Sequence, residues 1–198
     1  MRRSGLAVFG SLAGLVLALQ AFPVNSQPAK VLYALRATPI FAAAGGHAVG
    51  KLTPGAPLTA VGLAKGGYQP FMIAAWSQQD DDQTLVLAQG QRIVLATLAA
   101  GAHTKIVSSA KDDYGNVWHK VELTGFVAAS ALSADQTVVW TQAHALYATR
   151  CSACHALHKT TEFTANQWPA IVTSMTKNAA LRPDQAALIT QYLQTHAK

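Results

Sequence analysis

The chain has only two cysteines, and both stand in one short segment, Cys151-Ser-Ala-Cys154-His155. A Cys-x-x-Cys pair alone is typical of a thiol redox pair or of half a zinc site. A zinc site needs further ligands at finger spacing, and a thioredoxin-like pair follows a strand, whereas helix-forming residues precede this one. The histidine directly after the second cysteine completes the attachment motif for c-type haem. We therefore expect one covalent haem c on Cys151 and Cys154, with His155 as proximal iron ligand.

Residues 1–26 have the pattern of an export signal. Met1-Arg2-Arg3 is basic, Gly5 to Phe22 is weakly polar to apolar, and Val24-Asn25-Ser26 offers small residues near a cleavage point. We expect cleavage after Ser26. The alternative is a retained membrane anchor, because the apolar stretch just reaches the length of a spanning helix. In both cases the rest of the chain is expected in the periplasm, and no later segment is apolar enough to span a membrane.

Composition indicates a packed, mildly basic protein. Apolar residues make up 51% and charged residues 12% of the 198 residues, which excludes a disordered chain. Removal of the signal lowers Lys plus Arg from 15 to 13 against nine acidic residues, which leaves a net charge of about +4. No Lys/Arg run and no alternation of basic and aromatic residues is present, so nucleic acid is not an expected partner.

Three short helices are predicted around the cysteine motif. Thr141–Arg150 is rich in helix formers and places Leu146 and Tyr147 near the haem edge. A second helix is expected from Thr164, with Gln167 completing a capping-box pattern. A third begins at Pro183-Asp184 and runs towards Thr195. Together they predict a small all-α cytochrome c domain over residues 136–198, with the haem supplying much of its core.

The sixth iron ligand is predicted from the same region. Met175 ends an apolar helix face shared with Trp168, Ile171 and Val172, and methionine is a common axial ligand. An ordinary core methionine would occur in the same pattern. The alternatives are a histidine, for which the candidates are His158, His144 and His196, or an open coordination position that would suit ligand binding.

Residues 30–135 are predicted to form short strands. Two stretches, near Gly50–Trp76 and Ala96–Val127, share an order of strand, small-residue turn, strand, loop and aromatic-bearing hairpin. Their recurrence at about 46 residues argues for an internal duplication. They resemble the bacterial SH3-like β-barrel repeat, with one copy expected at 30–82 and a second at 83–135. The fold class expected is therefore multi-domain α+β, with all-β SH3-like tandem repeats followed by a small all-α cytochrome c domain.

Nearly the whole chain after the signal resembles the C-terminal module of the pentahaem cytochromes that feed periplasmic trimethylamine N-oxide reductases. Besides the two repeats, the resemblance rests on Trp140, Leu146-Tyr147, Arg150 to Leu157, Phe163 to Trp168, Met175 and Tyr192-Leu193. In that family a membrane-anchored tetrahaem domain oxidises quinol, and the monohaem module reduces the molybdenum enzyme. The tetrahaem domain has no counterpart in this sequence, so the chain is not expected to oxidise quinol alone.

The resemblance implies an electron carrier and not an enzyme, and no titratable cluster at catalytic spacing appears in the strand region. The donor implied is a membrane quinol-oxidising cytochrome, and the acceptor is a periplasmic molybdopterin N-oxide or S-oxide reductase. Two alternatives stay open: a cytochrome subunit of an exported sulfur-compound dehydrogenase, and a haem-based sensory module whose repeats bind a partner.

Overall fold

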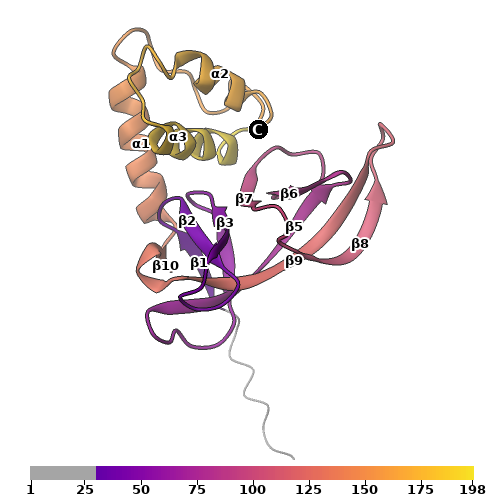
Figure 1. Cartoon of the computed structure of the whole chain (residues 1–198). Coiled ribbons are helices and arrows are strands. Elements are labelled where there is room, and N and C mark those ends of the chain that lie inside the picture. The colour runs from indigo at the N-terminus through magenta and orange to yellow at the C-terminus, as the bar shows by residue number, and fades with distance from the viewer. Residues whose placement is uncertain (1–29) are drawn as a thin grey trace, which may run out of the picture.

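A computed structural model describes residues 30–198 of the chain (Figure 1). The predicted export signal lies outside the described residues. Ten strands come first and three α-helices follow. Within the described part, no helix is long and apolar enough to cross a membrane. The strands are β1 (Val31–Ala34), β2 (Thr38–Phe41), β3 (Ala48–Leu52), β4 (Pro57–Ala60), β5 (Tyr68–Gln78), β6 (Asp81–Val86), β7 (Val94–Leu98), β8 (Lys105–Lys111), β9 (Val117–Ala128) and β10 (Leu132–Ser133).

Six of the strands close into a barrel. Going round it, the order is β5, β6, β7, β3, β2 and β9, and β9 returns to β5. Every one of these pairings is antiparallel. The β5–β9 pairing is the longest and runs in unbroken register from Tyr68 opposite Ala128 to Gln78 opposite Trp118. β8 continues the sheet beyond β9, and β4, β1 and β10 extend it on the other side of β5.

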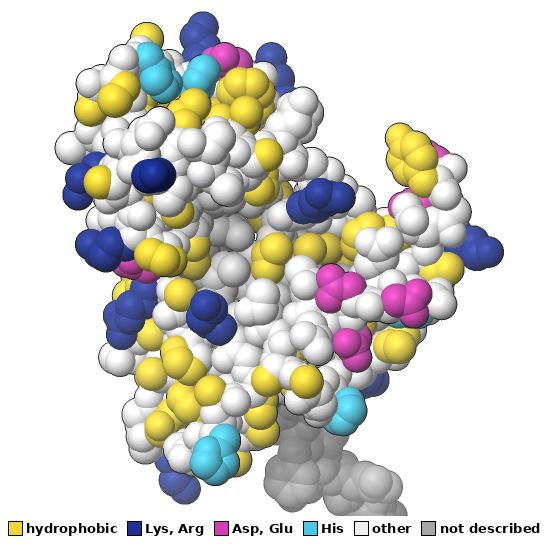
Figure 2. Space-filling view, turned by 45° about the horizontal axis from the view of Figure 1, so that its top comes forward, with side chains coloured by type: hydrophobic (Ala, Val, Ile, Leu, Met, Phe, Trp, Pro, Cys, Tyr) yellow, Lys and Arg dark blue, Asp and Glu magenta, His cyan; other side chains and the backbone are white. Residues whose placement is uncertain are grey.

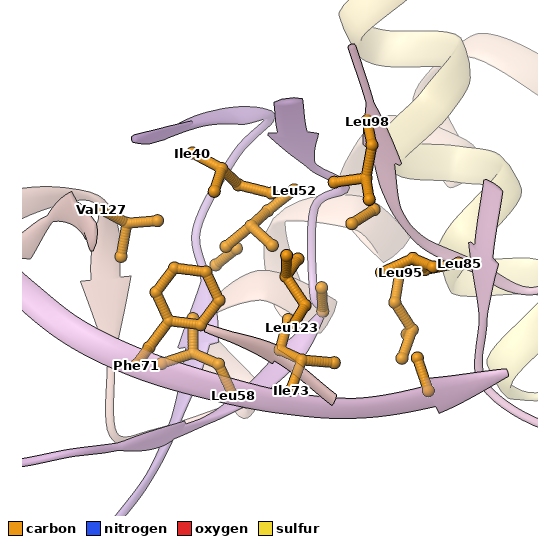
Figure 3. Packing of buried hydrophobic residues seen from close by; sticks show 14 of the residues in the cluster. Ile40, Leu52, Leu58, Phe71, Ile73, Leu85, Leu95, Leu98, Leu123 and Val127 are labelled. Atoms are coloured by element: carbon orange, nitrogen blue, oxygen red, sulfur yellow. The ribbon is translucent and has the colours of Figure 1, made fainter. Parts of the chain in front are cut away.

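The barrel core follows from period-two alternation along the two longest strands. In β5, Phe71, Ile73 and Ala75 are buried while their neighbours are more exposed, and in β9 Val121 and Leu123 alternate in the same way. All five belong to one hydrophobic cluster, and Figure 3 shows Phe71, Ile73 and Leu123 pointing toward side chains from other strands. The residues labelled there are Ile40, Leu52, Leu58, Phe71, Ile73, Leu85, Leu95, Leu98, Leu123 and Val127.

The fold-class prediction is wrong. The strand region is one continuous sheet and not a pair of SH3-like barrels in tandem. The pairing pattern does repeat, because β2–β3 corresponds to β6–β7 and β4–β5 corresponds to β8–β9. However, the two copies pair with each other through β3–β7 and β5–β9, so they share one barrel. Short apolar stretches between turn residues predicted the strands, but such local patterns carry no information on which distant strands pair.

The helices also depart from the predicted small all-α domain, because they are fastened to the barrel. α1 (Thr137–Cys151), α2 (Trp168–Met175) and α3 (Pro183–Thr195) lie together on one side of it (Figure 1). In α3 the amide of Gln191 donates to the carbonyl oxygen of Val94 at 2.7 Å, and Gln194 donates to that of Arg92 at 3.0 Å. Both glutamines are buried. Since a buried amide left unpaired is costly, these bonds fix α3 against β7.

α1 contacts the barrel at a glycine. Gly55 has φ +76°, and a Cβ placed on it would lie 2.8 Å from Cζ2 of Trp140 in α1. Only a residue without a side chain permits this approach. This contact is one of those that hold α1 against the barrel, together with the packing of α1 on Leu35.

Candidate haem-attachment site

The cysteine motif begins on the last residue of α1. Val139, Ala143 and Tyr147 are buried and recur every four residues on one face of that helix. Cys151 follows on the same face and is half-buried, so its thiol joins the interior of the helical unit. The helix ends there, and Cys154 and His155 lie exposed in the turn after it. The motif thus spans the boundary between a buried helix face and a surface loop.

A pocket with an apolar lining lies between this turn, α2 and α3. Its volume is about 20 Å³. Four of its lining residues could attach a haem or ligate its iron: Cys151, His155, His158 and Met175. The other lining residues are large and apolar or aromatic: Tyr147, Trp168, Ile171, Val172, Leu181 and Leu193. Cys154 is not part of the lining.

Both histidines of the pocket have one ring nitrogen engaged. Nδ1 of His155 lies 2.6 Å from the carbonyl oxygen of Ala156, and Nδ1 of His158 lies 2.8 Å from a carboxylate oxygen of Glu162. These oxygens only accept hydrogen bonds, so each Nδ1 is the donor. In the neutral imidazole this leaves Nε2 with a lone pair, which is the state that ligates a metal. The donor set therefore fits a haem iron.

Two hydrogen bonds hold the loop that follows the motif. The hydroxyl of Tyr147 donates to the carbonyl oxygen of His158 at 2.7 Å. Nε1 of Trp168 donates to the carbonyl oxygen of Thr160 at 3.0 Å. Burial, together with the nearby Cys151 thiol, raises the pKa of Tyr147 to about 12, so it stays a donor at neutral pH. Burial also raises the pKa of the Cys151 thiol.

Aromatic rings continue from the loop into α2. The ring of His158 lies 5.2 Å from that of His155 and 5.3 Å from that of Phe163. Phe163 packs edge-to-face on Trp168 at 5.0 Å. Such edge contacts are favourable for aromatic pairs, so they order the segment between the motif and α2.

The structure separates the predicted candidates for the sixth ligand into two groups. Met175, at the end of α2, and His158 line the same pocket as His155. His144 and His196 do not line it; their rings pack on Tyr192, at 5.9 Å and 4.5 Å.

Sequence reasoning placed most of the local elements and missed the residues that connect them. The third helix begins at Pro183 and ends at Thr195 as predicted. The second helix begins at Trp168 and not at Thr164, although the Thr164 N–H does donate to the Gln167 side chain at 2.9 Å. Gln194 and Asn166 were missed. The sequence gives little indication of their role, since an isolated Asn or Gln is usually an ordinary surface residue.

Comparison with known proteins places the chain in a family. Residues 26–132 match the family described as TorC third cytochrome c domain. The chain belongs to this family. Membership in a cytochrome c family implies haem c. The matched segment contains the barrel strands, and the cysteine motif lies after its end.

Relatives of the family are similar over longer stretches. The cytochrome c-type protein TorY of Escherichia coli O157:H7 is 33% identical over 151 residues, which is 74% of this chain and 40% of the relative. TorY of Haemophilus influenzae is 31% identical over 128 residues, 62% of this chain and 34% of the relative. TorC of Escherichia coli K12 is 26% identical over 172 residues, 84% of this chain and 44% of the relative.

The chain thus spans less than half the length of these relatives. No solved structure matches it.

Proposed function

We propose that the chain is a periplasmic monohaem cytochrome c that carries electrons and is not an enzyme. The haem is bound through thioethers to Cys151 and Cys154, with His155 as proximal ligand and Met175 as sixth ligand. The observation that carries the proposal is the pocket that gathers a motif cysteine, a histidine with a free Nε2 and a methionine thioether within an apolar lining. Family membership supports the same cofactor.

The helical segment over residues 136–198 supplies every residue of this site. When bound, the haem would supply one-electron redox chemistry at its iron. The apolar side chains from α2 and α3 exclude water from the pocket, and the Tyr147 bond to His158 keeps the loop in place.

Met175 is proposed over His158 for a geometric reason. His158 follows His155 by only three residues in the same loop, and its ring lies 5.2 Å from that of His155. Met175 comes from a different element, at the end of α2. His155 and Met175, from separate elements, would hold the iron between them, whereas the short link between His155 and His158 would be strained if both ligated it.

The partners proposed are a membrane quinol-oxidising cytochrome as donor and a periplasmic molybdopterin N-oxide or S-oxide reductase as acceptor. Support comes from the family match and from the similarity to TorY and TorC proteins. These similarities to cytochrome c-type proteins favour a carrier over the sensory module.

The experiment is a stopped-flow measurement of haem reoxidation. The protein, reduced with dithionite and freed of excess reductant, is mixed with a trimethylamine N-oxide reductase and its substrate. Rapid reoxidation that requires both enzyme and substrate is the expected result. Reoxidation no faster than with substrate alone would contradict the choice of acceptor.

The ligand assignment is tested separately by ferric spectra of two variants. Met175→Ala should abolish the methionine-to-iron charge-transfer band, and His158→Ala should retain it. Retention of the band in Met175→Ala would contradict the assignment.

A further inference from the structure

A second, much larger hollow lies on the barrel side of the molecule. It is a groove of about 1030 Å³ between strands β6 and β7 and the turn that joins β8 to β9. In Figure 1 that turn and the helices stand on opposite sides of β6 and β7. Pockets for small molecules measure roughly 300–1000 Å³. An open groove at the upper end of that range suits a segment of polypeptide better than a small ligand.

The groove adjoins the candidate haem site. Asn166 lines the groove, and Trp168, two residues later, lines the pocket beside Cys151. The wall between them is rigidly held, because the Asn166 side chain accepts from the Arg92 N–H at 2.7 Å and donates to the carbonyl oxygen of Gly90 at 2.8 Å. A partner seated in the groove would therefore be held beside the haem pocket.

The β8–β9 turn forms the far rim and is pre-organised. The carboxylate of Asp112 accepts hydrogen bonds from the backbone N–H groups of Tyr114 and Asn116, from the Asn116 amide and from Nε1 of Trp118, at 2.9–3.0 Å. These bonds lower the pKa of Asp112, those from the side chains of Asn116 and Trp118 most. The turn presents Tyr114 with 91% of its surface exposed. Tyrosine is one of the residue types that contribute most to binding at protein interfaces, and here it lies on a rigid rim.

Acidic side chains gather around the groove, although the chain as a whole is basic. Five of the nine acidic residues lie at two turns, three at 80–82, where the turn after β5 leads into β6, and two at 112–113, in the turn after β8. The Gln79 N–H donates to the carbonyl oxygen of Val117 at 2.8 Å, which brings the two turns together. Asp81, Asp112 and Asp113 line the groove against Arg92 and Lys111. Figure 2 shows a group of acidic side chains gathered over the barrel, in a protein with net charge +6.

The floor between these charges is partly apolar, with Val86, Val94 and Trp118 among the lining residues. Lysine and arginine cover such a floor well, since their stems are aliphatic while their heads reach acidic groups at the rim. From the groove, the exposed tyrosine and this charge distribution, we propose that the groove docks a basic segment of the redox partner. The identity of the partner as a redox protein rests on the proposed function; the basic character of the segment does not.

The probe for the experiment is a short fluorescein-labelled peptide of alternating lysine and leucine, titrated by anisotropy into the haem-loaded full chain. A peptide of alternating glutamate and leucine is the charge-reversed probe. The lysine peptide should bind, more weakly as salt rises, and the glutamate peptide should not. Asp113→Lys and Tyr114→Ala should each weaken binding by about tenfold.

Matched controls separate the groove from general effects. Thr141→Lys combined with Gln142→Lys adds the same charge as Asp113→Lys at exposed positions of α1, and Leu63→Ala removes a side chain that is 90% exposed elsewhere. Both controls should bind the peptide like the wild type. Absent binding, or equal losses in variants and controls, would overturn the proposal. If the chain carried no haem but bound the lysine peptide through Asp113 and Tyr114, the proposed function would fail while the groove assignment stood.

Discussion

The hydroxyl of Tyr147 in α1 and the carbonyl oxygen of His158 are joined by a hydrogen bond of 2.7 Å. The two residues lie on either side of the cysteine motif, so this single bond closes the loop that contains Cys151, Cys154 and His155. Tyr147 is 5% exposed, which shields the bond from water. It makes the geometry of the motif depend on a residue that has no direct role in attaching haem.

Tyr147→Phe removes this bond while keeping the ring. We expect the free energy of unfolding to fall by about 1–2 kcal/mol, because the carbonyl group of His158 loses its donor. Urea denaturation followed by circular dichroism measures the change. Tyr114→Phe is the matched control, since Tyr114 is 91% exposed, and should change stability by less than about 0.5 kcal/mol. Equal effects of the two substitutions would contradict a structural role for the bond.

The raised pKa of Tyr147 also predicts a dependence on pH. The folded chain holds the proton to about pH 12, whereas the unfolded chain releases it near pH 10.0. Between these values the folded state binds more protons, so stability is unaffected by this group below pH 10 and falls as pH rises above it. When the free energy of unfolding is measured at several alkaline pH values, it should fall less steeply with pH in Tyr147→Phe than in the wild type. Part of the fall should remain, because burial also raises the pKa of Tyr192.

Gly55→Ala should loosen α1 from the barrel. The new Cβ would overlap the ring of Trp140, and a positive φ is itself unfavourable for alanine. We expect the free energy of unfolding to fall by about 3 kcal/mol or more, because overpacking and backbone strain act together. Gly62→Ala is the control, because Gly62 has φ +85° with nothing within 4 Å of a Cβ. Thermal unfolding should show the smaller loss there, and equal losses would mean that the Trp140 contact contributes nothing.

Gln194→Met tests the attachment of α3 to the barrel. The Gln194 amide donates to the carbonyl oxygens of Arg92 and Ala165, at 3.0 Å and 2.8 Å, and is 3% exposed. Methionine keeps the volume and removes both bonds, so a loss of about 2–3 kcal/mol is expected. Gln142→Met, at an exposed position of α1, should stay within about 0.5 kcal/mol. Urea denaturation measures the free energy of unfolding of both variants. An unchanged value for Gln194→Met would contradict the role of Gln194 in attaching α3 to the barrel.

The features predicted correctly are those set by neighbours in the sequence. Pro183 and Asp184 start α3 through backbone restriction and favourable charge at the first turn. The strand character of residues 30–135 was also predicted, from short stretches rich in Val, Ile, Leu and Ala that are separated by Gly, Pro and Asp. The pairing of β5 with β9 was not predictable in this way, because closure of the barrel brings together residues that are 40 to 60 positions apart, from Gln78–Trp118 to Tyr68–Ala128.

In the candidate site too, some features follow from the local sequence and others depend on tertiary packing. The spacing of Cys151, Cys154 and His155 predicts attachment chemistry without any tertiary structure. The nearness of Met175 and His158 to one pocket depends on how α2 packs against α3. The groove beside Asn166 was not foreseen, because Asn166 lies more than 70 positions from Gly90 and Arg92, the residues to which it is hydrogen-bonded.

The most direct test of the central claim is the intact mass of the exported protein after denaturation, read together with its reduced-minus-oxidised visible spectrum. The account predicts a mass increase of one haem, a c-type spectrum, and loss of the covalent haem when Cys151 and Cys154 are both changed to alanine. A mass equal to that of the polypeptide alone, or haem retained covalently in the double variant, would contradict it.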